Sequence, residues 1–237
     1  MKWVPQCQDL PPDMLIEIEK FWEKVKNKKM YNGKLARLDS WSVKNNILNL
    51  NLSITDYRTL IYSNHHIQHI IETWGEKYIS RALGISAVVL TSDRFLMLMR
   101  RSDLVGEYPE CIDVFGGHIN ISKDSEFPGI HEAMLQELEE ELGLMPDEID
   151  LQCIGLLKNN QNQKPELIFT AHIALTVNEV INKSHSAIDR FEFTKIIVLP
   201  HLDKVLTSFL KKNELLFTPS ALGSINIFKQ SGSQIPL

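Results

Sequence analysis

The first third of the chain alternates between helical and strand-like patterns of apolar residues. Apolar positions recur at helical spacing from about residue 13 to 27, with Asp13 as a candidate N-cap. Two segments of alternating apolar and polar residues then flank Lys44-Asn45-Asn46, a pattern typical of a β-hairpin. Residues 56–83 return to a mostly helical pattern. We therefore expect a small α+β extension over residues 1–81.

From residue 85 onward, strand-like runs dominate and helices follow or separate them. The predicted strands cover two runs within 85–102, joined at Ser92-Asp93, and then 111–119, 151–159, 166–177 and 190–199. The predicted helices cover about 129–142, 201–213 and 219–230. Strands with helices between and after them are typical of the α/β class. We expect residues 82–237 to form one α/β/α sandwich with a mixed sheet.

The predicted helix that ends in "LQELEEELGL" (135–144) carries an unusual charge pattern. Its apolar stripe consists of three leucines, Leu135, Leu138 and Leu142. Three glutamates fall within an arc of about 100° on the other side, Glu137, Glu140 and Glu141. Gly143 is expected just beyond the helix end, where the helix dipole disfavours negative charge. The three carboxylates therefore either face solvent or bind a cation.

Composition and charge narrow the class of protein. With 43% apolar and 23% charged residues, the chain is typical of a globular protein. A net charge of -5 argues against a general nucleic-acid or membrane-surface binder, and no apolar run approaches the roughly 20 residues of a transmembrane helix. The start of the chain lacks the apolar stretch of a secretory signal, and the three cysteines suggest no disulfide framework. We expect a cytoplasmic protein.

A glycine pair precedes the acidic helix and strengthens the cation interpretation. Gly116 and Gly117 end the predicted strand over 111–119, where glycine lets a backbone approach a ligand closely. Carboxylate ligands on a rigid helix suit Mg²⁺, with Mn²⁺ as an alternative, because these hard cations bind through oxygen. The sequence therefore predicts a strand, a glycine pair, a loop and a metal-binding helix in that order.

This segment resembles the Nudix hydrolase family, whose signature is Gly-x5-Glu-x7-Arg-Glu-U-x-Glu-Glu-x-Gly-U, with U an aliphatic residue. The second half matches at six positions: Glu137, Leu138, Glu140, Glu141, Gly143 and Leu144. The resemblance implies that the three glutamates bind catalytic divalent cations, together with the carbonyl of Gly117. The predicted sandwich would then have the Nudix fold, with the N-terminal extension contributing to the substrate cleft.

The first half of the signature departs from the family pattern. Gln136 stands in the Arg position, Pro128 stands in the Glu position, and the loop after Gly117 is about five residues longer than the pattern. Because the Arg and its upstream Glu are missing together, we interpret the change as the loss of a supporting ion pair. The metal-binding glutamates themselves are retained.

A more extended resemblance, to mammalian Nudix hydrolases of UDP-glucose and UDP-galactose, runs along most of the chain. The similar stretches include "FWEKVKN", "LSITDYRTL", "LGISAVV", "FLMLMRRSDLVGEYPECIDVFGGH" and "TPSALGSINIF", in the same order. The resemblance implies Mg²⁺-dependent hydrolysis of a UDP-sugar to UMP and a sugar 1-phosphate. Two alternatives stay open: hydrolysis of another nucleoside diphosphate derivative, such as ADP-ribose or a dinucleotide, and a nucleotide-sugar sensor that binds without cutting.

Six residues are candidates for substrate contacts: Tyr57, Arg58, Arg100, Arg101, His118 and Asn159. The arginines could hold a diphosphate through charge-assisted hydrogen bonds, and the tyrosine ring could meet a uracil. Ordinary packing, a strand end or a turn explains each of these residues as well. His65 and His69 have a spacing that can hold zinc, but no third ligand is evident, so we interpret them as structural.

Overall fold

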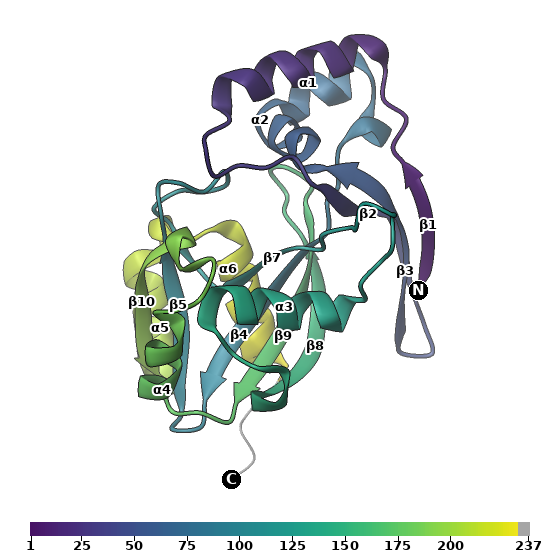
Figure 1. Cartoon of the computed structure of the whole chain (residues 1–237). Coiled ribbons are helices and arrows are strands. Elements are labelled where there is room, and N and C mark those ends of the chain that lie inside the picture. The colour runs from purple at the N-terminus through teal and green to yellow at the C-terminus, as the bar shows by residue number, and fades with distance from the viewer. Residues whose placement is uncertain (232–237) are drawn as a thin grey trace. The chain divides into compact units, whose positions relative to one another are not determined.

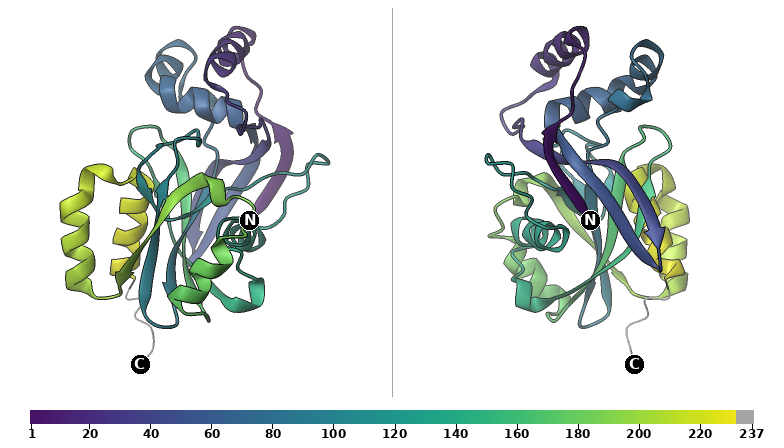
Figure 2. Two further views of the ribbon diagram at one scale, coloured as in Figure 1. Left: turned by 60° about the vertical axis from the view of Figure 1, so that its left-hand side comes forward. Right: turned by 90° about the vertical axis from the view of Figure 1, so that its right-hand side faces the viewer.

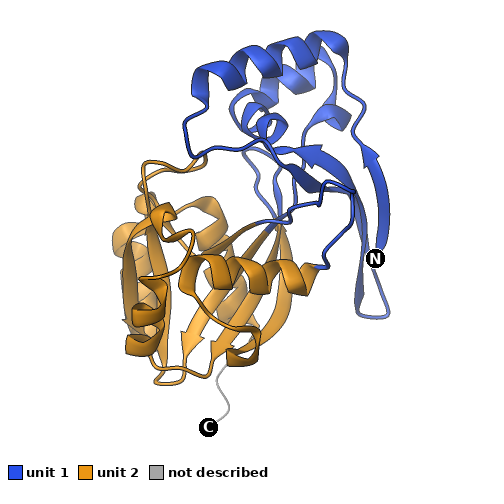
Figure 3. Cartoon of the chain, in the orientation of Figure 1, with its two compact units in different colours: residues 1–84, 118–129, 158–165 blue, residues 85–117, 130–157, 166–237 orange. Residues whose placement is uncertain are grey.

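The computed structural model describes residues 1–231, which divide into two compact units (Figures 1 and 3). Unit 1 consists of residues 1–84, 118–129 and 158–165. Unit 2 consists of 85–117, 130–157 and the described residues from 166 onward. The chain therefore passes between the units several times. The end of the expected second domain, residues 232–237, lies outside the described residues.

Unit 1 is an α+β unit built on a three-stranded sheet with the strand order β1-β3-β2. Its elements are β1 (Lys2–Cys7), α1 (Pro12–Val25), β2 (Lys34–Lys44), β3 (Ile47–Asp56), α2 (Tyr57–Thr73) and the short 3-10 helix η1 (Glu76–Tyr78). Met14 and Ile18 of α1 pack with Tyr62 and Ile70 of α2 in a buried cluster. The two helices therefore bury their apolar side chains against each other.

The predicted hairpin is confirmed, and its turn has the expected chemistry. Lys44 of β2 faces Ile47 of β3 across a two-residue loop. Asn45 and Asn46 have φ angles of 51° and 59°. Positive φ at both loop positions is the geometry that two-residue hairpins favour, and asparagine adopts it more easily than most residues. Strand β1, which pairs in parallel with β3, was not predicted because its sequence "KWVPQC" lacks a clear alternation.

Unit 2 is built on a seven-stranded sheet whose main path has the order β10-β5-β4-β9-β8. The strands are β4 (Gly84–Thr91), β5 (Phe95–Arg101), β6 (Ile112–Asp113), β7 (Phe115–His118), β8 (Ile149–Lys158), β9 (Pro165–Ile173) and β10 (Phe193–Pro200). Every residue of β4 is buried, as expected for a central strand with helices on both faces. The predicted α/β class is confirmed.

Helices cover both faces of this sheet, as Figure 2 shows. The helices are α3 (Ile130–Leu142), α4 (Val177–Ser184), α5 (Asp203–Asn213) and α6 (Pro219–Gln230), and the 3-10 turns are η2 (Pro146–Glu148), η3 (Arg190–Glu192) and η4 (Glu214–Leu216). α5 and α6 lie on one face, where Leu206, Ile225 and Phe228 pack against Val88 and Leu98. α3 and α4 lie on the other face. No helix among residues 1–231 is long and apolar enough to cross a membrane.

Two predicted strands are wrong in detail. The strand over 111–119 is in fact two short strands, since β6 pairs with β5 whereas β7 pairs with β4. The strand over 166–177 ends at Ile173, and residues from Val177 form α4. The signal for this helix was present as a capping box, because the backbone N–H of Thr176 donates to Glu179 Oε2 at 2.8 Å. The apolar residues of "IALTV" concealed it within a strand-like run.

Candidate metal centre

The acidic helix α3 ends as its sequence predicts. Gly143 has a φ of 70°, its N–H donates to Glu139 O at 2.8 Å, and the N–H of Leu144 donates to Leu138 O at 3.5 Å. This left-handed glycine cap satisfies the last carbonyls of the helix. The buried face is rotated from the predicted leucine stripe, because it includes Met134 and Glu141 while Leu135 is only half-buried.

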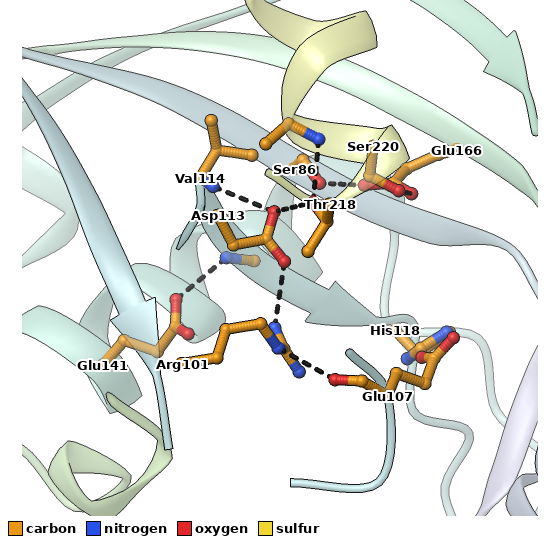
Figure 4. Close-up of polar contacts among 12 residues, drawn as sticks. Ser86, Arg101, Glu107, Asp113, Val114, His118, Glu141, Glu166, Thr218 and Ser220 are labelled. Atoms are coloured by element: carbon orange, nitrogen blue, oxygen red, sulfur yellow. Dashed lines mark hydrogen bonds and ion pairs between the residues drawn. The ribbon is translucent and has the colours of Figure 1, made fainter. Parts of the chain in front are cut away.

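Glu141 is a buried acid, not a member of a solvated face. Its side chain lies beside β7, and the backbone N–H of Gly116 donates to Oε2 at 2.9 Å (Figure 4). The second oxygen, Oε1, is buried and has no hydrogen-bond partner among the described residues. Burial raises the pKa of the Glu141 carboxyl well above its usual range, and the charges of Glu137 and Glu192 raise it further. The Gly116 hydrogen bond and Arg101 offset part of this rise.

Glu137 lies against Gly117, and the glycine is required for that approach. A Cβ added at Gly117 would lie 2.5 to 2.7 Å from the three carboxylate atoms of Glu137. Gly116 has a different reason to be glycine. Its φ is 143°, and an added Cβ would collide with the backbone of Ile85 and Ser86. The glycine pair thus brings the strand backbone and two carboxylates of α3 together.

Glu140 points differently from the other two glutamates. Its Oε1 accepts a hydrogen bond of 2.8 Å from Gln136 Nε2, and both residues line a surface cleft of about 750 Å³ with Met145 and Ile188. Among residues 1–231, no group of three or more His, Cys, Asp or Glu side chains has a geometry that would hold a metal ion as it stands. The structure therefore brings together Gly116, Gly117, Glu137 and Glu141, and leaves the Glu140 carboxylate on the cleft side.

The residues present fit a divalent cation. A fully buried carboxylate that has one oxygen without a partner is costly, and a second carboxylate nearby adds repulsion. A hard cation bound at this point would satisfy the Glu141 oxygen and offset the charge of both acids. The oxygen-only donor set formed by these glutamates and the Gly117 carbonyl suits Mg²⁺ or Mn²⁺.

Of the two strand-end arginines, Arg101 points into unit 2 and is already engaged. Its Nη1 donates to Asp113 Oδ2 at 3.1 Å, and its Nε donates to the carbonyl of Glu107 at 3.0 Å (Figure 4). Arg100 is half-buried at the next position of β5, opposite Lys195 of β10. As predicted from alternation, the two arginines occupy successive positions that face opposite sides of the sheet.

Tyr57 and Arg58 lie in unit 1 at the start of α2. The Tyr57 ring packs edge-on against Trp22, with ring centroids 6.1 Å apart. Arg58 forms ion pairs with Glu19 and Asp56, the second at 3.3 Å. These contacts match the packing alternative for both residues. Their role in substrate binding remains a prediction.

His118 and Asn159 also belong to unit 1 and stay predictions. His118 Nε2 lies 3.5 Å from Lys164 Nζ. Asn159 is buried, and its Oδ1 accepts a hydrogen bond of 2.8 Å from the backbone N–H of Gln161, which is turn chemistry. The zinc spacing of His65 and His69 has a structural explanation, since His65 contacts the carbonyl of Ile61 and His69 contacts Glu17.

Sequence reasoning missed two acids near the glutamates. Asp113 is buried and bound to Arg101, and burial raises the pKa of its carboxyl. Glu192 adds negative charge that raises the pKa of Glu141, and burial also raises its own pKa. Asp113 precedes the glycine pair by three residues, but its sequence context shows no motif. Glu192 comes from η3, far along the chain, and no local signal connects it to α3.

Comparisons with known proteins found similarity to a UDP-glucose pyrophosphatase and to Nudix hydrolases. The uridine diphosphate glucose pyrophosphatase NUDT22 of Mus musculus is 32% identical over 117 residues, which cover 40% of this chain and 38% of the relative. Nudix hydrolase 9 of Arabidopsis thaliana is 23% identical over 231 residues, which cover 78% of this chain and 71% of the relative. A solved Nudix hydrolase from Nitrosomonas europaea aligns at 15% identity and a TM-score of 0.42, covering 66% of this chain and 93% of that one. No family model matches the sequence.

These alignments are partial for the pyrophosphatases. The chain spans between 25% and 41% of the length of the matched relatives from Mus musculus, Bos taurus and Homo sapiens. The similarity therefore concerns a part of those proteins, whereas the activity in their names is that of the whole proteins.

Proposed function

We propose that the chain is a Nudix hydrolase, as its similarity to named members of that family supports, and that it hydrolyses the diphosphate of a UDP-sugar. The products would be UMP and a sugar 1-phosphate, with UDP-glucose or UDP-galactose as substrate and Mg²⁺ as cofactor. The observation that carries the proposal is the buried Glu141 carboxylate, whose Oε1 has no partner among the described residues and whose neighbour Glu137 lies against Gly117. The names of three matched relatives support the substrate class.

In this proposal Glu137, Glu140, Glu141 and the Gly117 carbonyl hold the cations. Bound Mg²⁺ lowers the pKa of a water molecule and offsets the charge that develops on the phosphate oxygens. Glu140 would have to leave Gln136, a rotation that an exposed hydrogen bond of this kind permits at small cost.

The chain itself supplies orientation and a low dielectric. The Gly116 N–H binds Oε2 of Glu141, and Oε1, which has no partner among the described residues, would then be available to a cation. Burial of Glu141 strengthens every electrostatic interaction that it makes. Mn²⁺ should substitute for Mg²⁺, because both prefer oxygen ligands.

The first experiment is an incubation with UDP-glucose at slightly alkaline pH, with and without Mg²⁺, followed by chromatography of UMP. We expect UMP to form only with the cation. ADP-ribose and a dinucleotide serve as comparison substrates. Faster cleavage of either would identify that nucleotide as the preferred substrate of the same hydrolytic reaction. Formation of UMP at the same rate in excess EDTA would contradict the metal site.

The second candidate function is a nucleotide-sugar sensor, and one observation favours it. The Glu140 carboxylate is held by Gln136 at 2.8 Å and does not converge with the other two glutamates. A sensor would bind UDP-glucose with a saturable thermal shift and release no UMP at any Mg²⁺ concentration. The expected cytoplasmic location also remains a prediction.

A further inference from the structure

Arg101 is a buried cation whose hydrogen bonds are directed at the protein. Its side chain is 14% exposed, and that of its partner Asp113 is 12% exposed. Nη1 donates to Asp113 Oδ2 at 3.1 Å, and Nε donates to the carbonyl of Glu107 at 3.0 Å. Figure 4 shows the guanidinium between these two acceptors. An arginine held in this way has fewer donors for a phosphate group.

Asp113, which binds Arg101, also binds the backbone that leads to the glycine pair. Its Oδ1 accepts hydrogen bonds from the backbone N–H of Val114 at 2.9 Å and from Thr218 Oγ1 at 2.8 Å. Both oxygens of the carboxylate are therefore used, one by Arg101 and the other by two donors. Removal of the guanidinium would leave a buried carboxylate without its cation, which is strongly unfavourable.

The same short segment is fixed again three residues later. The N–H of Gly116 donates to Glu141 Oε2 at 2.9 Å, and Gly117 follows against Glu137. Residues 113–117 are thus held by Asp113 at one end and by the α3 glutamates at the other. The position of Asp113 determines where the Gly116 N–H points, and this N–H orients Glu141.

We propose that Arg101 is a positioning residue, which through Asp113 fixes segment 113–117 and thereby orients Glu141 and the Gly117 carbonyl, and that it does not contact the diphosphate. The inference rests on the proposed function only for the identity of the substrate. It replaces the substrate contact that the sequence predicted for Arg101. The predicted contact of Arg100 is unaffected.

The test compares Arg101→Met, Arg101→Lys, Asp113→Asn and the double variant Arg101→Met/Asp113→Asn in the full chain. Mg²⁺ affinity is measured by calorimetry, the exchange of the Gly116 amide is measured in metal-free protein, and KM and kcat are measured with UDP-glucose. The control is Lys195→Met, which removes an exposed positive charge from the neighbouring strand β10.

We expect Arg101→Met and Asp113→Asn each to weaken Mg²⁺ binding by about 10- to 100-fold, the range typical of residues that orient metal ligands. Exchange of the Gly116 amide should accelerate by at least about tenfold, kcat should fall, and KM should stay within about threefold. Because the two residues act as one unit, the double variant should be no worse than the worse single variant. Arg101→Lys should recover part of the Mg²⁺ affinity, since it keeps the charge but not both hydrogen bonds.

A large increase in KM with unchanged Mg²⁺ affinity and Gly116 exchange would overturn the inference, because it would place Arg101 on the diphosphate. If the wild-type chain does not cleave UDP-glucose, the proposed function fails, but Mg²⁺ affinity and Gly116 exchange still decide the role of Arg101. If Arg101→Met does not fold, the nearly isosteric Asp113→Asn decides in its place. A wild-type chain that binds no Mg²⁺ overturns the inference together with the metal site.

Discussion

Glu141 shows why a candidate metal ligand can cost stability. The residue is 2% exposed, and one of its carboxylate oxygens has no partner among the described residues. The sequence predicted Glu141 as a metal ligand from its spacing with Glu137 and Glu140. It did not predict the burial, because the helical spacing centred the buried face on leucines, whereas the N–H of Gly116 in β7 supplies a hydrogen-bond donor for a carboxylate on that face.

At the scale of this residue, Glu141→Gln should lower kcat by at least about 10²-fold and leave the fold intact. The amide keeps the size of the side chain and one acceptor for the Gly116 N–H, but it loses the charge that a cation needs. Steady-state kinetics with UDP-glucose and Mg²⁺ measure the effect, and far-UV circular dichroism controls for folding. Wild-type turnover in this variant would contradict the assignment of Glu141 as a metal ligand.

The same substitution should raise the Tm of the metal-free protein at neutral pH. The pKa of Glu141 is higher in the folded than in the unfolded state, so its stabilising contribution is complete at acidic pH and is lost as pH rises through the folded pKa. The difference in Tm between variant and wild type should therefore be small near pH 4 and increase toward neutral pH. Each kcal/mol corresponds to about 2–4 °C in a protein of this size. Mg²⁺ should raise the Tm of the wild type and not that of the variant.

At the scale of elements, strand β7 contains two glycines that are glycine for different reasons. Gly116→Ala should lower the Tm strongly, because its φ is 143° and the new methyl group would collide with the backbone of β4. Gly117→Ala should change the Tm little, since the new methyl group meets only the end of the Glu137 side chain. It should nevertheless reduce Mg²⁺ affinity, measured by calorimetry. Equal Mg²⁺ affinity in Gly117→Ala and wild type would contradict the approach of Glu137 to this strand.

Elements with a strong local signal were predictable, and elements that depend on pairing were not. The hairpin turn at Asn45-Asn46 and the glycine end of α3 each have local chemistry that only one conformation satisfies. The break between β6 and β7 arises because neighbouring strands β5 and β4 compete for one apolar run, and this competition has no signature within the run. The capping box at Thr176 was readable, but the strand-like run before it masked the start of α4.

At the scale of the whole molecule, neither unit is a continuous stretch of sequence. Within unit 1, the N–H of Ala36 donates to Ile119 O, and the N–H of Ile121 donates to Lys34 O, both at 2.9 Å. Asn162 Nδ2 likewise donates to Asn64 Oδ1 at 2.9 Å. Segments 118–129 and 158–165 therefore depend on residues that lie far earlier in the chain.

Deletion of residues 1–84 should consequently prevent the rest of the chain from folding as a soluble monomer. The deletion removes every one of these partners and leaves the backbone of 119–121 without its β2 neighbour. Size-exclusion chromatography and circular dichroism measure the outcome. Deletion of residues 1–7 is the matched control, because it removes only the edge strand β1 and should lower the Tm without abolishing the fold. A cooperative thermal transition in a chain that begins at residue 85 would contradict the expectation.

The five passages of the chain between the two units also constrain its synthesis. Unit 1 is incomplete until residue 165 has left the ribosome, and unit 2 still requires β9, β10, α5 and α6 after that point. Unit 1 therefore cannot fold completely before most of unit 2 has been translated. Proteins whose domains fold one after another from the N-terminus differ in this respect. Many of the required pairings join distant residues, which slows folding. During translation β2 is therefore synthesised well before Ile119, whose carbonyl accepts a hydrogen bond from the N–H of Ala36, and β4 is synthesised well before its sheet neighbour β9.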